Sequence, residues 1–433
     1  MKRMIRNGSL LIICLVLCRA QVTHAQKYSL LIKGGHVIDP KNNIDRIMDV
    51  AITADTIAAL AADIDTAQAR KVIHAEGMYV TPGLIDIHSH NFAGTEENHY
   101  LCNGYTALAP DGFTFRCGVT TVVDAGSSGW RSFEKFRTQT IQHSQTRVLA
   151  FLNIVGEGMR GGVYEQNTAD MDAKMTALTI LHNKQYVVGI KVAHYVGAEW
   201  TPVDRAVEAG KMAGVPVMID FGEQRPALSL DSLFMTHLRP GDIFTHAYAK
   251  LRSRMAIVND QGQLQPFALA ARKKGIVFDV GHGGSSFSFS QAIPALKAGF
   301  YPSTISTDIH ATSMNAGMKD MLNVMSKFLN MGMDVSSVIK ASTWEPAKTI
   351  QHEELGNLSK GAVADIAILQ VMKGKFGFID ASGSRMDGNQ KLECELTMRA
   401  GRIVYDLNGL ASVPYQANTT TVAVDEHASG AEN

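Results

Sequence analysis

The sequence has few cysteines, no excess of charge of either sign and no long hydrophobic run, and each shortage excludes a class of protein. Five cysteines without ligand-type spacing exclude a disulfide framework and a zinc knuckle. Lys and Arg total 41, as do Asp and Glu, so no basic excess marks a nucleic-acid-binding surface. A hydrophobic fraction of 45% against 19% charged residues excludes a disordered chain. We therefore expect a large folded core and no nucleic-acid partner.

The apolar run at residues 10–17 is far shorter than the ~20 residues that cross a bilayer. Basic residues precede it: Lys2, Arg3 and Arg6. Small residues ending at Ala25 follow it, and this order is typical of a cleaved secretory signal peptide. We expect residues 1–25 to be removed, and the mature protein to be periplasmic or secreted, with no membrane segment.

Two cysteines, Cys14 and Cys18, lie in the predicted signal peptide. The mature chain keeps three, Cys102, Cys117 and Cys394. A disulfide between Cys102 and Cys117 is compatible with an oxidising compartment, and buried free thiols are the alternative.

Short β-rich segments occupy both ends of the chain, whereas its middle alternates strands and helices. The end segments are residues 28–33, 36–38, 50–52, 56–60, 364–369 and 396–405. Apolar runs typical of strands buried on both faces of a parallel sheet lie at 84–87, 120–124, 148–154, 187–192, 215–219, 242–245, 275–280 and 304–306. Helical periodicity fills residues 133–141, 170–181, 203–212, 267–273, 290–297 and 318–329.

Eight strands alternating with helices predict an α/β fold, a closed (β/α)8 TIM barrel. An open doubly wound sheet is the alternative, but no Gly-x-Gly-x-x-Gly turn follows the first strand. We predict the barrel over residues 81–356 and a small β-sandwich domain formed by residues 26–80 and 357–415. The polar tail, residues 416–433, is predicted to be disordered.

Ionisable side chains follow five of the predicted strands. His88 and His90 are two residues apart, so both imidazoles can point the same way. The others, at four later strand ends, are Lys191, Asp220, His246 and Asp308. Strand ends of one barrel meet at a single face, and polar groups buried there without partners destabilise the fold. A shared divalent cation accounts for all six residues, and separately hydrogen-bonded core side chains are the alternative.

Lys191 requires its own explanation, because a protonated ammonium group cannot bind a cation. Burial in an apolar strand lowers the pKa of a lysine. The neutral amine can add carbon dioxide, and the two oxygens of the resulting carbamate can bridge two metal ions. An ion pair of Lys191 with Asp220 or Glu223 is the alternative.

Seven motifs resemble one known family. They are TPGLIDIHSH (81–90), GVTTVVDAGS (118–127), GIKV (189–192), GDIFTH (241–246), FDVGHG (278–283), STDIH (306–310) and AVADI (362–366). Together they resemble the amidohydrolase superfamily, in particular its bacterial deacetylase branch, often labelled dihydroorotase-like. The resemblance extends from about residue 31 to residue 405.

The resemblance implies two divalent metal ions, usually zinc. His88, His90 and Asp308 would bind one ion, His246 would bind the other, and carboxylated Lys191 would bridge them.

At the end of the fifth strand, family members usually have another histidine, whereas this chain has Asp220. A carboxylate is shorter than an imidazole and adds negative charge. Three outcomes stay open for the second ion: zinc is retained, a harder ion such as manganese replaces it, or the site is lost. A shift in the alignment that brings in the neighbouring Glu223 also stays open.

The motifs predict a metal-dependent hydrolase in which Asp308 is the general base. We expect it to cleave an amide or ester of a small acylated compound, as a deacetylase or amidase does. The alternatives are a cyclic-amide hydrolase of the dihydroorotase type and a catalytically weakened binding protein. Candidate substrate-binding residues in strand-end loops are His282, Tyr195, Arg160 and Arg225. The sequence does not determine the substrate, and it leaves open whether the protein forms a homo-oligomer.

Overall fold

The computed structural model describes residues 26–94, 107–220, 222, 224–252 and 254–415. The predicted signal peptide, the predicted tail and Cys102 lie outside these residues. Within the described part of the chain, no helix is both long and apolar enough to cross a membrane. Cys117 and Cys394 are buried free thiols.

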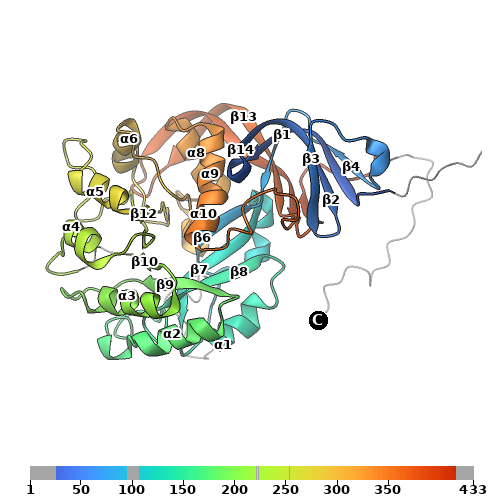
Figure 1. The fold of residues 1–433 in the computed structure, drawn as a ribbon. Helices are drawn as coiled ribbons and strands as arrows, with labels where there is room; N and C mark the ends of the chain where they lie inside the picture. Colours follow the sequence, from blue (N-terminus) through green and yellow to red (C-terminus); the bar gives the residue numbers. More distant parts are fainter. Residues whose placement is uncertain (1–25, 95–106, 221, 223, 253, 416–433) are drawn as a thin grey trace, which may run out of the picture.

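A curled sheet of seven parallel strands surrounds the centre of the molecule (Figure 1). Each strand pairs with the next along the chain, from β6 to β12. Their bounds are β6 (Leu84–Ser89), β7 (Val119–Gly129), β8 (Arg147–Asn153), β9 (Val187–Val192), β10 (Val217–Ile219), β11 (Ile243–Phe244) and β12 (Val277–Phe278). This arrangement confirms the predicted α/β barrel.

The eighth predicted strand, residues 304–306, is reduced to single bridges. Thr304 bridges to Asp279 beside β12, and Ile309 bridges to Ser89 in β6, so this segment closes the ring. Asp308 has a left-handed backbone, with φ of 52°, which interrupts the extended conformation that a regular strand needs. The sequence pattern therefore located the segment correctly and overestimated its regularity.

Helices surround the barrel. Their bounds are α1 (Phe133–Phe136), α2 (Ala173–His182), α3 (Thr201–Ala213), α4 (Leu230–Ser232), α5 (Pro266–Lys274), α6 (Phe289–Lys297), α7 (Ala311–Asn315), α8 (Met321–Asn330), α9 (Val335–Ser342) and α10 (Trp344–Thr349). Two helices begin about three residues later than predicted, because the N-caps are Asp172 and Asp320. Each of these side chains accepts a hydrogen bond from a backbone amide three residues on.

Both chain ends build the second sheet, in the order β15-β14-β13-β5-β1-β2-β3, with β4 paired to β1. Figure 1 shows the blue N-terminal strands beside the orange-red C-terminal ones, at one side of the barrel. The bounds are β1 (Leu30–Asp39), β2 (Ile44–Thr53), β3 (Thr56–Ala61), β4 (Val72–His74), β5 (Tyr79–Pro82), β13 (Ile366–Ile379), β14 (Arg385–Arg399) and β15 (Arg402–Asp406). The proposed domain boundaries stay predictions.

Two predictions of strand bounds in this sheet need correction. Gly34 and Gly35 do not end the first strand, because the left-handed Gly34 forms a bulge within a continuous β1. Conversely, residues 396–405 are not one strand. Ala400 and Gly401 adopt positive φ values of 47° and 74°, which turn the chain from β14 into β15.

Apolar side chains fill the barrel below the carboxyl ends of its strands, including Ile85, Val123, Phe151 and Met218. A larger apolar layer packs between the strands and the outer helices. In β9, Ile190 and Val192 belong to that outer layer, so Lys191 between them points to the inside of the barrel. The polar groups at the strand ends therefore lie next to a layer of apolar side chains inside the barrel.

Candidate metal centre

Three non-glycine residues at the barrel's strand ends have left-handed backbones. His194 and His246 have φ of 55°, and Asp308 has φ of 52°. Such conformations cost about 1–3 kcal/mol each and cluster at functional sites. These backbone conformations place three polar side chains at one rim of the barrel.

The first group of side chains is His88, His90 and Asp308. The Nε2 atoms of His88 and His90 lie 3.5 Å and 3.0 Å from Asp308 Oδ1. Among the described residues, these three side chains each offer a ligand atom, and the three atoms lie within 4.8 Å of one another. All three side chains are buried. Two imidazoles and a carboxylate at this spacing fit a divalent cation such as zinc.

Hydrogen bonds fix the His88 ring. Thr245 Oγ1 donates its proton to Asp279 Oδ2 (2.7 Å), so it can only accept from His88 Nδ1 (2.9 Å). His88 Nε2 therefore carries the lone pair and faces the centre. Burial lowers the pKa of His88 well below its usual range, which keeps the ring neutral. His90 Nδ1 is held by Ser127 Oγ at 3.1 Å. Such outer partners orient metal ligands.

Asp308 is ionised although it is buried. Burial raises its pKa, but the hydrogen bond from His90 and the nearby histidines outweigh burial and lower it below the usual value. Gly283 packs against the carboxylate, since a Cβ atom at Gly283 would lie 2.3 Å from Asp308 Oδ2. A larger residue at position 283 would displace the carboxylate.

Lys191 lies beside the first group, fully buried, with Nζ 3.2 Å from His88 Nε2. Burial lowers the pKa of its amine. Among the described residues, no ion pair joins Lys191 to a carboxylate, so the alternative pairing with Asp220 is not formed. Glu223, the other predicted partner, lies outside the described residues. Lys191 therefore lies buried beside His88, with its amine pKa lowered.

The second group is centred on Asp220. His246 Nε2 lies 3.4 Å from Asp220 Oδ2, and His246 Nδ1 donates to the carbonyl oxygen of Gly281 at 2.5 Å. Burial raises the pKa of Asp220, but His246, Lys191 and His194 outweigh it and hold that pKa well below its usual range. The rings of His88 and His246 are 5.0 Å apart, so the two groups adjoin.

Sequence reasoning missed His194, which lies two residues beyond β9. Its Nε2 is 3.9 Å from Asp220 Oδ2, and its Nδ1 is 2.8 Å from Oε2 of the buried Glu165. Burial lowers the pKa of His194, but the hydrogen bond to Glu165 outweighs it and raises the pKa to about 9. The only sequence signal was a histidine three residues after Lys191. His310, also missed as a candidate, has Nδ1 3.8 Å from Asp308 Oδ1.

Each predicted substrate-binding residue has a bonding partner within the protein. His282 is fully buried, stacked on Phe287, with Nε2 2.7 Å from Lys327 Nζ. It has no exposed surface through which a substrate could reach it in this structure.

The other three candidates also have partners of their own. The Tyr195 hydroxyl donates to Glu199, and Arg160 pairs with Glu157 at 2.8 Å. Arg225 is exposed, and its backbone amide donates to Val196. Substrate contacts by these residues stay predictions.

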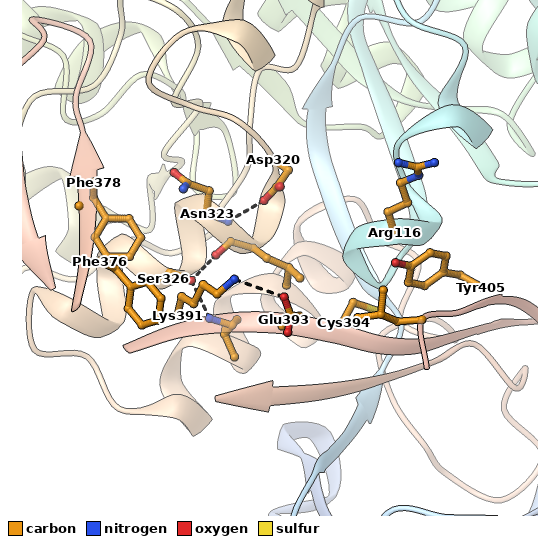
Figure 2. Close-up of a pocket in the computed structure, with 14 residues that line it drawn as sticks. Arg116, Asp320, Asn323, Ser326, Phe376, Phe378, Lys391, Glu393, Cys394 and Tyr405 are labelled. Atoms are coloured by element: carbon orange, nitrogen blue, oxygen red, sulfur yellow. Dashed lines mark hydrogen bonds and ion pairs between the residues drawn. The ribbon is translucent and has the colours of Figure 1, made fainter. Parts of the chain in front are cut away.

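A separate cavity of about 350 Å³ lies between α8 and the β13–β14 hairpin (Figure 2). Three of its charged groups have partners: Lys391 Nζ lies 3.2 Å from Glu393 Oε1, and Asp320 caps α8. None of the candidate metal-binding residues lines this cavity. The strand ends, and not this cavity, therefore carry the candidate active site.

Comparisons with known proteins show the family of this chain. A model of the amidohydrolase family matches residues 268–404. The chain is 33% identical to a deacetylase of Brucella anthropi over 349 residues, 78% of this chain and 83% of that protein. This chain belongs to the amidohydrolase family. It is also 31% identical to a deacetylase of Enterococcus faecalis over 391 residues, 88% of this chain and 99% of that one.

Solved structures of the amidohydrolase fold are also similar. A crystal structure of an adenine deaminase has a TM-score of 0.78 and 29% identity, covering 88% of this chain and all of the other. A dihydroorotase structure has a TM-score of 0.76 and 28% identity, covering 87% and 99%. As an amidohydrolase, the chain is a hydrolytic enzyme whose family typically binds divalent metal ions, and the group of His88, His90 and Asp308 fits such an ion.

Proposed function

We propose that the protein is a deacetylase or amidase with two divalent ions, which removes an acyl group from a small molecule. The observation that carries this proposal is the convergence of His88, His90 and Asp308 beside buried Lys191. The deacetylase relatives, similar over most of the chain, support acyl transfer to water as the reaction.

The chain's own residues supply positioning and proton transfer. When bound, divalent ions such as zinc would supply Lewis acidity and lower the pKa of water. His88, His90 and Asp308 would hold one ion, and Asp220 and His246 the other. Ionised Asp308 accepts a proton from the attacking water and returns it to the leaving nitrogen or oxygen. The hydrogen bonds of His88 with Thr245 and of His90 with Ser127 keep this geometry fixed.

Carboxylation of Lys191 is part of this proposal. Its buried amine has a lowered pKa, so the neutral form that attacks carbon dioxide is accessible. The carbamate adds two oxygens at the point where the two groups adjoin. Removing bicarbonate and carbon dioxide during metal loading should therefore reduce metal uptake, and adding bicarbonate should restore it.

The substrate is tested with a panel of N-acetyl amino acids and acetyl esters, and dihydroorotate as a second arm. Dihydroorotases are similar over a short segment, for example 41% identity over 87 residues of the Geotalea daltonii enzyme. Turnover of an acetylated compound and not of dihydroorotate supports the deacetylase proposal. Turnover of dihydroorotate alone replaces it with the cyclic-amide alternative, and metal binding without turnover of any compound supports a binding protein.

We also propose that the enzyme is exported. The basic start, the apolar run at residues 10–17 and the small residues before Gln26 support a cleaved signal peptide. N-terminal sequencing of protein from the native host should give a start near Gln26. An intact Met1 or Lys2 in the cytoplasmic fraction contradicts export.

A further inference from the structure

The second half of the centre contains a histidine that no prediction assigned. His194 lies beyond the end of β9, and its side chain is 34% exposed. Its left-handed backbone matches that of His246 and Asp308, which are both candidate ligands. All three strained residues lie at the same rim of the barrel.

Glu165 fixes the orientation of this ring. The carboxylate is 2% exposed, accepts from the backbone amide of Gly161 at 3.0 Å, and lies 2.8 Å from His194 Nδ1. A histidine that binds a metal through one nitrogen almost always donates its other N–H to a carboxylate, a carbonyl or water. Glu165 is such a partner, and it leaves Nε2 on the side of Asp220.

The distances around Asp220 suit ligands of one ion. Metal–nitrogen bonds of ~2.0–2.1 Å and metal–oxygen bonds of ~2.0–2.2 Å allow at most about 4.3 Å between two ligand atoms. Asp220 Oδ2 lies 3.4 Å from His246 Nε2 and 3.9 Å from His194 Nε2. The longer distance exceeds that of a hydrogen bond and is that of an ion pair, so His194 and Asp220 face each other without a direct hydrogen bond.

We infer that His194 is a ligand of the second metal ion, together with Asp220 and His246, and that Glu165 orients it. This inference rests on the two-metal centre of the proposed function. The three side chains are gathered less closely than the first group, so His194 moves inward when the ion binds. Its partly exposed side chain has the room to do so.

The test counts metal ions in protein loaded with zinc or manganese and freed of unbound metal. Wild type should hold two ions per chain and His194→Ala one. A His194→Gln variant of similar size should also hold one, and thermal unfolding of both variants checks the fold. Glu165→Gln keeps an acceptor for Nδ1 but loses the charge, so it should bind the second ion about 10–100-fold more weakly.

His237→Ala is the matched control. His237 also pairs through Nδ1 with a carboxylate, Asp204 at 2.6 Å, but it stacks on Trp200 away from the strand ends. This variant should keep two ions with wild-type affinity.

His194 variants that hold two ions with wild-type affinity overturn the inference, whether or not their turnover falls. Wild type with a single ion overturns it as well, because no second ion then exists. Wild type with two ions and no turnover of any panel compound counts against the proposed acyl substrate, while the ion counts of the variants still decide the role of His194.

Discussion

The two halves of the metal centre differ in how firmly the fold holds them. In the first half, His88 and His90 are buried and each ring has a hydroxyl partner, Thr245 or Ser127. In the second half, Asp220 lies between two histidines at 3.4 Å and 3.9 Å, and one of them, His194, is partly exposed. The first half is thus preorganised, whereas we expect the second to close only when an ion enters. We expect the two ions to differ in affinity.

Metal removal should give the largest effect and show this difference directly. Titration with a chelator should remove the ions in two steps, the ion at Asp220 first, because its ligands are less preorganised. Turnover should be abolished once both ions are gone and restored by zinc or manganese. Metal content and turnover measured along the titration provide the check. Loss of both ions in a single step would show that the halves are equivalent.

Replacing the base of the first half should give the next largest effect. Asp308→Asn keeps the size and one oxygen of the side chain but cannot accept the proton, so kcat should fall about 10²–10⁴-fold. Metal content should fall less than kcat does, and the thermal unfolding midpoint should change little. Wild-type turnover in Asp308→Asn would exclude Asp308 as the base.

A smaller effect is expected from the partner of His88. Thr245→Val preserves shape but removes the acceptor of the His88 Nδ1 proton, so the first ion should bind about 10–100-fold more weakly. Competition with a metal-binding dye measures this affinity. Thr138 is exposed, so Thr138→Val is the control and should leave the affinity for the first ion unchanged. Unchanged affinity in Thr245→Val would show that the first half is not held by its outer hydrogen bonds.

The smallest expected effect is a pH dependence of stability that is due to the buried His282. Burial, with a smaller contribution from Lys327, lowers its pKa from 6.5 to about 3, so the unfolded state takes up a proton first as the pH falls. The stability due to neutral His282 is complete above pH 6.5 and is lost progressively between pH 6.5 and about 3. At 1.36 kcal/mol per pKa unit, roughly 2 kcal/mol should be lost between pH 7 and pH 5. Urea unfolding of wild type and His282→Asn at both values tests this, and an equal loss in both proteins contradicts it.

The sequence predicted the first half of the centre more fully than the second, for a physical reason. His88, His90 and Lys191 lie in or directly after strands, where a two-residue period determines which side chains share a face. His194 lies in a turn with a left-handed backbone, a conformation that periodicity does not reveal. Tyr195, the next residue, was predicted to contact substrate, and its hydroxyl donates to Glu199.

The same reason explains which parts of the fold were predicted less well. Seven strands were located by their apolar runs, but the bulge at Gly34 and the irregular segment at Asp308 depend on positive φ values. His282 was assigned to the substrate because it follows a strand. Its ring is buried beside Lys327, a residue of α8 that is 45 positions away in the sequence and that local periodicity does not reveal.

Anomalous X-ray diffraction from crystals of the zinc-loaded protein tests the two-metal centre most directly. We predict two peaks about 3.5–4 Å apart, one bounded by His88, His90 and Asp308, the other by Asp220 and His246. A single peak at the first group would show that the second half does not bind metal and that the enzyme works with one ion. No peak at the strand ends would contradict the proposed metal centre altogether.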